Sequence, residues 1–192
     1  MEFWNSLLTE KSWNILQDLQ KKPFNFILIG GWAAYLWSNL HKSKDIDIIV
    51  PEYESLEYLK SNFQLLKNDQ LKKYEIKIQE IDIDIYVHFY SRLPLPAQEI
   101  GKQVTPIQNI MVVRPEALLI LKQQAELDRG HSIKGQKDRI DIMSLLCFAP
   151  MDFTLYFSLL EKHGLDNFYP RLKEIVTCFM EFNQLGLTPR EL

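Results

Sequence analysis

Apolar residues along this chain recur with two spacings, and each spacing predicts a different kind of element. A spacing of three to four residues predicts amphipathic helices, while alternation or a short unbroken apolar run predicts strands. Helices are predicted over residues 5–21, 32–40, 52–66, 115–129, 136–148, 152–163 and 168–184. Strands are predicted over residues 24–29, 45–50, 74–81, 82–89 and 107–113.

Several of these predicted helices carry residues that favour helix ends. Pro115 stands at the favoured first position of its helix, and Gly130 follows the end of the same helix. Asp152 precedes the next-to-last helix as a cap, and Gly164 follows that helix as a stop signal. The boundaries of these two helices are therefore predicted more sharply than the others.

The order of the elements divides the chain into two parts. Residues 1–113 hold an N-terminal helix and all five predicted strands, while residues 114–192 hold helices alone. This order favours an α/β (α+β) fold, in which a mixed, twisted sheet of about five strands carries flanking helices. We expect an α/β domain over 1–113 and a C-terminal helical bundle over 114–192 that packs on it.

Composition and charge exclude several classes of protein. The chain has 192 residues, of which 46% are hydrophobic and 24% charged, as is ordinary for a globular domain with a real core. The net charge of −3 disfavours a protein whose whole surface grips nucleic acid, but it is compatible with a local basic groove. No apolar stretch approaches the roughly 20 residues of a membrane helix, and no N-terminal signal is visible, so we expect a cytoplasmic protein with no membrane partner.

The two cysteines fit a reducing compartment. Cys147 and Cys178 each lie inside an apolar run, and neither belongs to a CxxC motif. We therefore expect both of them to be small core residues rather than a disulfide or a metal site.

The strand over residues 45–50 carries the first candidate chemistry. Asp45 and Asp47 are two residues apart, so their carboxylates point to the same side of a strand. Two carboxylates at such close range repel each other unless a cation or a proton lies between them. Hard oxygen ligands of this kind suit Mg²⁺. A half-exposed structural strand with the same alternation is the alternative interpretation.

Two glycines end the preceding strand. Gly30 and Gly31 follow a buried apolar run and precede a predicted helix. A Gly-Gly turn at that place brings backbone N–H groups close to a helix N-terminus, which favours phosphate binding. The sequence thus predicts a phosphate site and a cation site about 14 residues apart along the chain.

A third carboxylate is available on a later strand. Asp82 and Asp84 alternate with isoleucines, and either one on a neighbouring strand would complete a site for two cations. We prefer Asp84, because it stands just before the most apolar stretch of that strand, and Asp82 is the alternative.

The ordered combination of these motifs resembles a known superfamily. Ile29-Gly30-Gly31 followed by Ser43-Lys44-Asp45-Ile46-Asp47 is similar to the signature of the DNA polymerase β-like nucleotidyltransferases. Within them the chain looks most like the small prokaryotic branch that includes abortive-infection (AbiEii-type) toxins. The resemblance is strongest over residues 26–50 and extends more weakly through Asp84 into the helical part.

The resemblance implies roles for further residues. Lys122 would contact the NTP phosphates, and Asp138, in a Lys-Asp pair with Lys137, would support the site or orient Lys122. Many relatives have serine where this chain has Gly31, so Ser43 would supply a hydroxyl nearby. The alternative interpretations are a solvated helix face for Lys122 and a charge cluster at a helix start for Lys137 and Asp138.

The resemblance also implies an activity. Asp45, Asp47 and Asp84 would bind Mg²⁺, and an acceptor hydroxyl would attack the α-phosphorus of an NTP with loss of pyrophosphate. The acceptor expected first is RNA, such as a tRNA end. Transfer to a protein side chain or a small molecule such as an antibiotic, and a non-catalytic nucleotide-binding module, are the alternatives. A cognate toxin or antitoxin is an expected partner.

Overall fold

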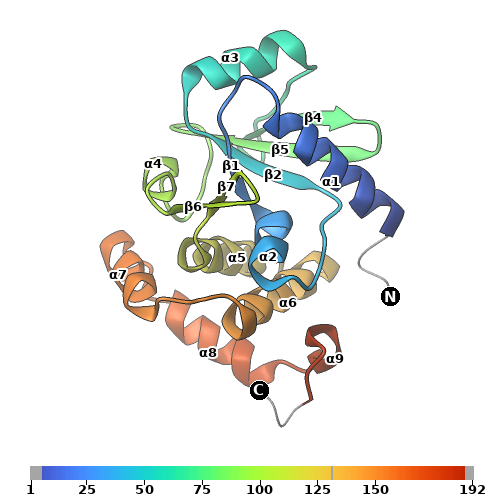
Figure 1. Ribbon diagram of the computed structural model, residues 1–192. Helices are drawn as coiled ribbons and strands as arrows, with labels where there is room; N and C mark the ends of the chain where they lie inside the picture. The colour runs from blue at the N-terminus through green and yellow to red at the C-terminus, as the bar shows by residue number, and fades with distance from the viewer. Residues whose placement is uncertain (1–5, 131, 189–192) are drawn as a thin grey trace.

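A mixed sheet forms the upper half of the molecule (Figure 1). The computed structural model describes residues 6–130 and 132–188, and residue 5 of the first predicted helix lies outside them. The strands are β1 (Ile27–Ile29), β2 (Ile46–Val50), β3 (Leu66–Asn68), β4 (Lys73–Ile78), β5 (Ile81–Val87), β6 (Val104–Ile107) and β7 (Ile110–Val113). Their order across the sheet is β3-β4-β5-β2-β1-β7-β6. The β1–β7 and β2–β5 pairs are parallel and the other pairs are antiparallel, so the predicted mixed α/β fold is confirmed.

The described residues form seven strands, so the expected number of about five was too low. The predicted strand over 107–113 covers the last residue of β6, the turn and all of β7, because Gln108 and Asn109 adopt positive φ angles of 49° and 65° and reverse the chain. Strand β3 was not predicted, because the sequence predicts a helix over 52–66 that includes Leu66, whereas α3 ends at Asn62.

Helices connect and cover these strands. They are α1 (Ser6–Gln20), α2 (Gly30–Ser38), α3 (Tyr53–Asn62), α4 (Ala97–Ile100), α5 (Pro115–Arg129), α6 (Ile133–Phe148), α7 (Phe153–His163), α8 (Phe168–Cys178) and α9 (Phe182–Leu185). The short α4 was not predicted. The last predicted helix is interrupted after Cys178, where Phe179 takes an extended conformation and is buried.

The helices surround the sheet on several sides. In Figure 1, α1 lies beside the strands and α3 above them, α2, α5 and α6 lie beneath them, and α7, α8 and α9 lie farther out. Helix α5 is central to this arrangement, since Leu118, Leu119 and Ile120 are consecutive and fully buried. Side chains at three consecutive helical positions point to different sides, so α5 is covered on several sides, and it packs against α2, α6, α7 and α8.

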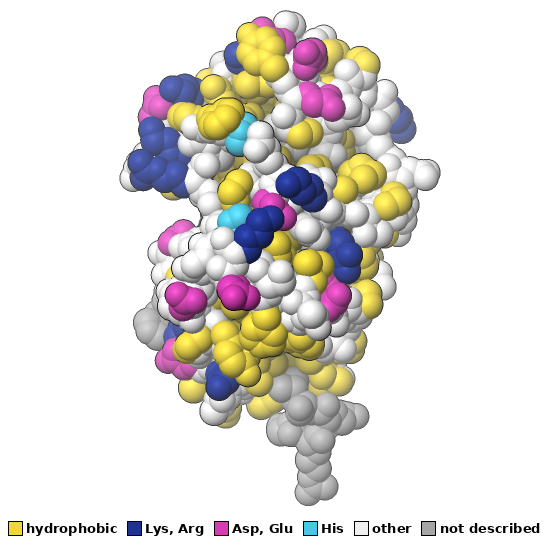
Figure 2. Space-filling model, turned by 90° about the vertical axis from the view of Figure 1, so that its left-hand side faces the viewer, with side chains coloured by type: hydrophobic (Ala, Val, Ile, Leu, Met, Phe, Trp, Pro, Cys, Tyr) yellow, Lys and Arg dark blue, Asp and Glu magenta, His cyan; other side chains and the backbone are white. Residues whose placement is uncertain are grey.

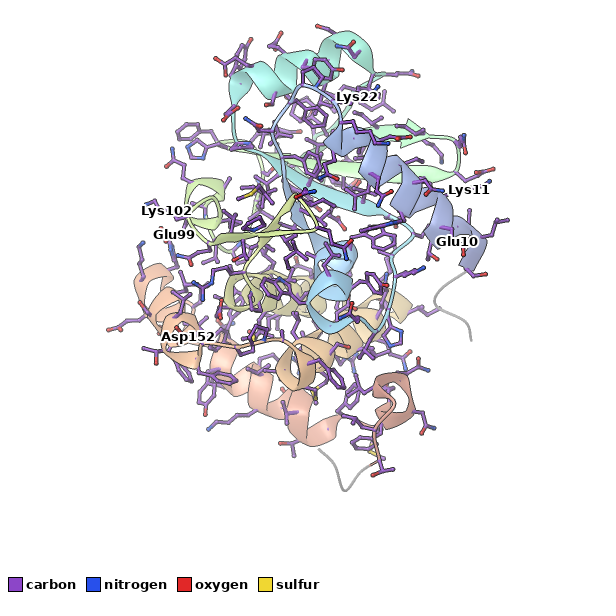
Figure 3. All side chains as sticks on the ribbon, in the orientation of Figure 1. Glu10, Lys11, Lys22, Glu99, Lys102 and Asp152 are labelled. Atoms are coloured by element: carbon purple, nitrogen blue, oxygen red, sulfur yellow. The ribbon has the colours of Figure 1, made fainter. Side chains whose placement is uncertain are left out.

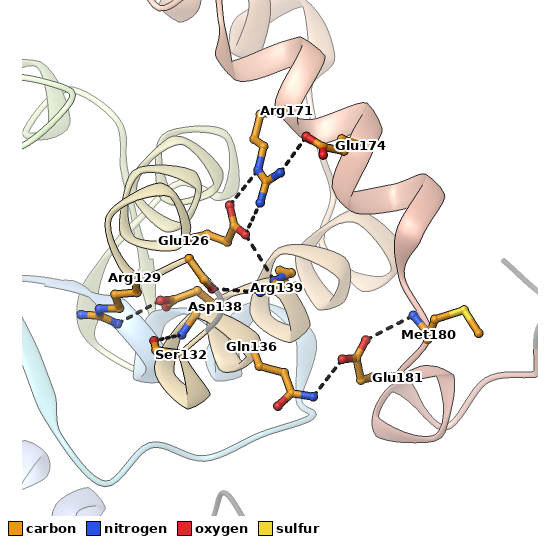
Figure 4. Close-up of polar contacts among 12 residues, drawn as sticks. Glu126, Arg129, Ser132, Gln136, Asp138, Arg139, Arg171, Glu174, Met180 and Glu181 are labelled. Atoms are coloured by element: carbon orange, nitrogen blue, oxygen red, sulfur yellow. Dashed lines mark hydrogen bonds and ion pairs between the residues drawn. The ribbon is translucent and has the colours of Figure 1, made fainter.

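Polar contacts fix the outer helices to this centre. Figure 4 shows Glu126 of α5 between Arg171 of α8 and Arg139 of α6. Glu126 is fully buried, with 3.0 Å from the Arg171 Nε to its Oε2 and 3.2 Å from the Arg139 Nε to its Oε1. Asp152 lies at the start of α7 (Figure 3), where its carboxylate accepts two backbone N–H groups and forms the predicted cap.

The structure also bears on the two cysteines and on membrane-spanning segments. Cys147 and Cys178 are exposed, so the prediction that both are core residues was wrong: each lies on the outer side of the last turns of its helix. Within the described residues, no helix is both long enough and apolar enough to cross a membrane.

Candidate active site

Gly30 and Gly31 are the first two residues of α2 rather than a separate turn before it. Gly30 has a φ of +68°, which favours glycine, and a Cβ atom placed on it would lie 2.6 Å from Asp47 Cγ. The N-terminus of α2 therefore lies directly against the Asp47 carboxylate. Its partial positive charge and free N–H groups suit an anion at the same place.

Ser43 fills the space beside the second glycine. A Cβ atom on Gly31 would lie 2.6 Å from the Ser43 Oγ, and Ser43 is buried. The Ser43 hydroxyl thus lies where a side chain of residue 31 would begin. The same point is 3.6 Å from the Lys137 Nζ, so α6 brings an ammonium to the start of α2.

Three carboxylates form a row across neighbouring strands. Asp47 of β2 is in parallel register with Asp84 of β5, which is in antiparallel register with Glu75 of β4. Directly paired residues point to the same face of a sheet, so the three side chains share one face. Asp82, the alternative third carboxylate, instead forms an ion pair of 3.5 Å with Lys77.

Asp45 lies immediately before β2. Its Oδ1 is buried and has no hydrogen-bond partner among the described residues. A buried carboxylate oxygen without a partner is costly, which makes this atom a candidate ligand for a cation.

Burial changes the acidity of the carboxylate row. It raises the pKa of Asp47, a direction that the nearby Asp45 charge reinforces and Lys122 opposes. Burial, together with the Asp47 charge, raises the pKa of Asp84 to about 6, although Lys73 acts in the opposite direction. The Lys73 Nζ lies 2.6 Å from the Asp84 Oδ2 and 3.1 Å from the Glu75 Oε1.

Lys122 is buried inside the protein, so a solvated helix face is the wrong interpretation of this residue. Its Nζ lies 2.6 Å from the Asp141 Oδ2 and 3.4 Å from the Asp138 Oδ1. Burial by itself lowers the pKa of Lys122, but the two aspartates outweigh it and hold the pKa above its ordinary value. Asp138 is also buried and bridges to Arg129, with 2.9 Å from its Oδ2 to the Arg129 Nη1.

Lys137 differs from Lys122 in its partners. It is half-buried, and no hydrogen bond or ion pair joins it to another described residue. Burial lowers the pKa of Lys137 against the opposing charge of Asp141. Its ammonium therefore remains available to an anion at the N-terminus of α2.

One cavity of about 460 Å³ opens over this region. Among the residues predicted for the site, Gly30, Asp47, Asp84, Lys122 and Asp138 line it, whereas Gly31, Ser43 and Asp45 do not. Ser43 lies against Gly31, the chain neighbour of the lining residue Gly30, and Asp45 is two residues from the lining residue Asp47.

Several cavity residues were not selected from the sequence. Arg92 and Arg129 line the cavity, as do Lys73 and Lys134, whereas Arg139 is turned toward Glu126 and Gly130. Lys73 lies one residue before the predicted strand over 74–81, and its sequence neighbours indicate no role for it. Its contact with Asp84 depends on strand register, which no local signal reveals.

The residues fit one divalent cation better than two. Asp45 and Asp47 offer hard oxygen ligands, and the buried Asp45 Oδ1 has no hydrogen-bond partner among the described residues. Asp84 is already bound to Lys73, and in the part of the chain that the structure describes no three histidine, cysteine, aspartate or glutamate side chains come together as a metal site.

Comparisons with known proteins define the class of fold. No protein-family model and no curated protein matches the chain. The antibiotic-resistance factor ANT(2″)-Ia is similar in structure, with a TM-score of 0.55 and 13% identity over 89% of this chain and 97% of that one. The Megavirus polyadenylate synthase has a TM-score of 0.50 and 15% identity, and the match covers 76% of this chain but only 32% of that one.

The chain therefore has a nucleotidyltransferase fold. At these identities the likeness concerns the fold, and the AbiEii-type branch stays a prediction from the sequence.

Proposed function

We propose that this protein is a Mg²⁺-dependent nucleotidyltransferase that moves a nucleoside monophosphate from an NTP to an acceptor hydroxyl. The observation that carries the proposal is the β1–α2 corner, where Gly30 lies against Asp47 and Asp47 lies opposite Asp84 on the wall of a cavity. In this proposal the helix end would bind phosphate, the carboxylates would bind the cation, and Asp84 would accept the proton.

The triphosphate would lie against positive groups at the start of α2. The backbone N–H groups of Gly30 and Gly31 would donate to phosphate oxygens. Lys137 would add the nearest unpaired ammonium, 3.6 Å from the position of a Cβ on Gly31. Lys122, held by Asp138 and Asp141, would supply a fixed charge at the cavity wall rather than a mobile contact.

Asp45 and Asp47 would hold the Mg²⁺ ion. A bound cation of this kind neutralises charge on the phosphate oxygens of the transition state. Asp84 would take the proton of the acceptor hydroxyl, because it lines the cavity beside Asp47. The chain would otherwise act by positioning its substrates.

RNA is the acceptor that we propose first. Arg92, Arg129 and Lys134 line the cavity and would contact a phosphate backbone near its mouth. The second candidate is a small-molecule acceptor, which is favoured by the ligand-like volume of about 460 Å³. On the face drawn in Figure 2, acidic and basic side chains are interspersed, so an RNA contact there would be local rather than extensive. A toxin or antitoxin partner is proposed from the sequence resemblance alone.

The test is transfer of label from each α-labelled NTP, in the presence of Mg²⁺, to total RNA, to protein or to small molecules of a lysate. Asp47→Asn should abolish transfer. Asp82→Asn is the matched control, since Asp82 is an aspartate of the neighbouring strand that pairs with Lys77 outside the cavity.

Four outcomes separate the alternatives. Label on RNA that is lost in D47N and kept in D82N supports the proposal. Label on protein or on a small molecule keeps the activity and replaces the acceptor. Transfer that survives in D47N, or NTP binding without any transfer, contradicts the enzymatic proposal, and the latter favours a nucleotide-binding module.

A further inference from the structure

Lys73 places a positive charge where a two-cation site would have none. Its side chain is only 12% exposed, although lysine normally keeps its ammonium in water. The Nζ lies 2.6 Å from the Asp84 Oδ2 and 3.1 Å from the Glu75 Oε1. A nearly buried ammonium between two carboxylates is an internal counter-ion.

The sheet itself fixes Lys73 in this position. Lys73 and Glu75 are two residues apart on β4, so they share a face, and Glu75 is in register with Asp84. The row of Asp47, Asp84 and Glu75 concentrates three negative charges on that face. Like charges at this range need a positive partner, and Lys73 supplies one from within the row.

A divalent cation at Asp84 would compete with this ammonium. Both would bind the same carboxylate, and a dication brought next to a fixed ammonium would be repelled. By contrast, the Asp45 Oδ1 is buried without a hydrogen-bond partner, and among the described residues no ion pair within 4 Å occupies the Asp45 or Asp47 carboxylate, so their oxygens stay free for a metal ion. The Asp84 carboxylate therefore already has a positive partner, whereas the Asp45–Asp47 pair can still take a metal ion.

We infer that the Lys73 ammonium takes the place of a second divalent cation at Asp84, so that the site binds one Mg²⁺, at Asp45 and Asp47. This inference rests on the proposed function, because it concerns the cation content of the same site. Lys73 is then a positioning residue that orients the Asp84 carboxylate and neutralises Glu75.

The experiment counts bound cations rather than turnover. Mn²⁺ is titrated into the full chain held in excess over α,β-methylene ATP, GTP, CTP or UTP, so that nearly all the analogue is protein-bound, and free Mn²⁺ is followed by electron paramagnetic resonance. The variants are Lys73→Met, which removes the charge, and Lys73→Arg, which keeps it. Lys77→Met is the matched control, because Lys77 lies on the same strand but is 65% exposed and pairs with Asp82.

The wild type, K73R and K77M should bind one Mn²⁺ per bound nucleotide analogue, and K73M should bind two. Two Mn²⁺ ions in the wild type, or one in a folded K73M, overturn the inference while leaving the proposed function intact. If K73M does not fold, the wild-type count still decides the matter. If none of the four analogues binds with Mn²⁺, the proposed function itself fails, which is a different result from a wrong count.

Discussion

The close approach of Gly30 to Asp47 leads to a quantitative prediction. In Gly30→Ala, the new Cβ would lie 2.6 Å from Asp47 Cγ and 2.7 Å from Asp47 Cβ, so the aspartate must move. The residue would also keep a φ of +68°, which costs an L-residue about 1 to 2 kcal/mol. Displacing Asp47 from its rotamer adds roughly 0.5 to 1.5 kcal/mol or more.

Gly164→Ala separates these two costs. Gly164 has nearly the same backbone angle, a φ of +64°, but nothing lies within 4 Å of its Cβ position. G164A should lose only the conformational part, about 1 to 2 kcal/mol, and keep its cation and nucleotide affinity. G30A should lose roughly 1 kcal/mol more and bind the Mn²⁺–nucleotide analogue at least about tenfold more weakly, since Asp47 would be displaced from the cation.

Urea denaturation of both variants gives the free energies of unfolding, and the Mn²⁺ titration gives the affinities. Thermal unfolding gives a second measure of stability. For a chain of this size, each 1 kcal/mol lost corresponds to about 2 to 4 °C in Tm, so the difference in stability between G30A and G164A is measurable. Equal destabilisation of G30A and G164A, with unchanged Mn²⁺ binding in G30A, would refute the reasoning that Gly30 is required by its contact with Asp47.

Three further predictions concern stability. Glu126→Ala should lower the free energy of unfolding by about 3 to 5 kcal/mol, because it leaves Arg139 and Arg171 without their shared buried partner. A loss below about 1 kcal/mol in urea denaturation would contradict this expectation. Asp152→Ala should cost about 0.5 to 2 kcal/mol through loss of the α7 cap, again measured in urea, and an unchanged midpoint would count against the cap. The pKa of Asp84 is raised from 3.8 to about 6, so between these pH values the folded state keeps a proton on Asp84 that the unfolded state has released. The free energy of unfolding should therefore fall, by on the order of 2 to 3 kcal/mol, as pH rises from about 4 to about 6. Asp84→Asn should remove that part of the pH dependence, and parallel curves for wild type and D84N would show the assignment to be wrong.

Local chemistry accounts for what could be predicted from the sequence. Pro115, Gly130, Asp152 and Gly164 mark the ends of α5 and α7 as expected, because capping depends only on neighbouring residues. The mixed α/β fold also follows from the two hydrophobic spacings, each of which reflects one element.

The predictions from the sequence were wrong where the neighbouring residues give no signal. The Gln108-Asn109 turn contains no glycine or proline, so one strand was predicted in place of the β6–β7 hairpin. Cys147 and Cys178 lie in apolar runs, but each is near the end of its helix and on the side away from the core. Only the packing of the helices decides which side of such a run is covered.

The sequence by itself determined the carriers of the proposed chemistry: the two glycines that begin α2, and the aspartates of β5 and of β2 with the residue before it. Their spacing follows from strand and turn geometry, which acts over a few residues. The tertiary structure alone decided their charge state and partners. It placed Asp84 opposite Asp47, set Lys73 between Asp84 and Glu75, and buried Lys122. Ion pairing depends on distances across strands and between helices, and those distances are fixed only when the sheet register and the packing of α5 and α6 are complete.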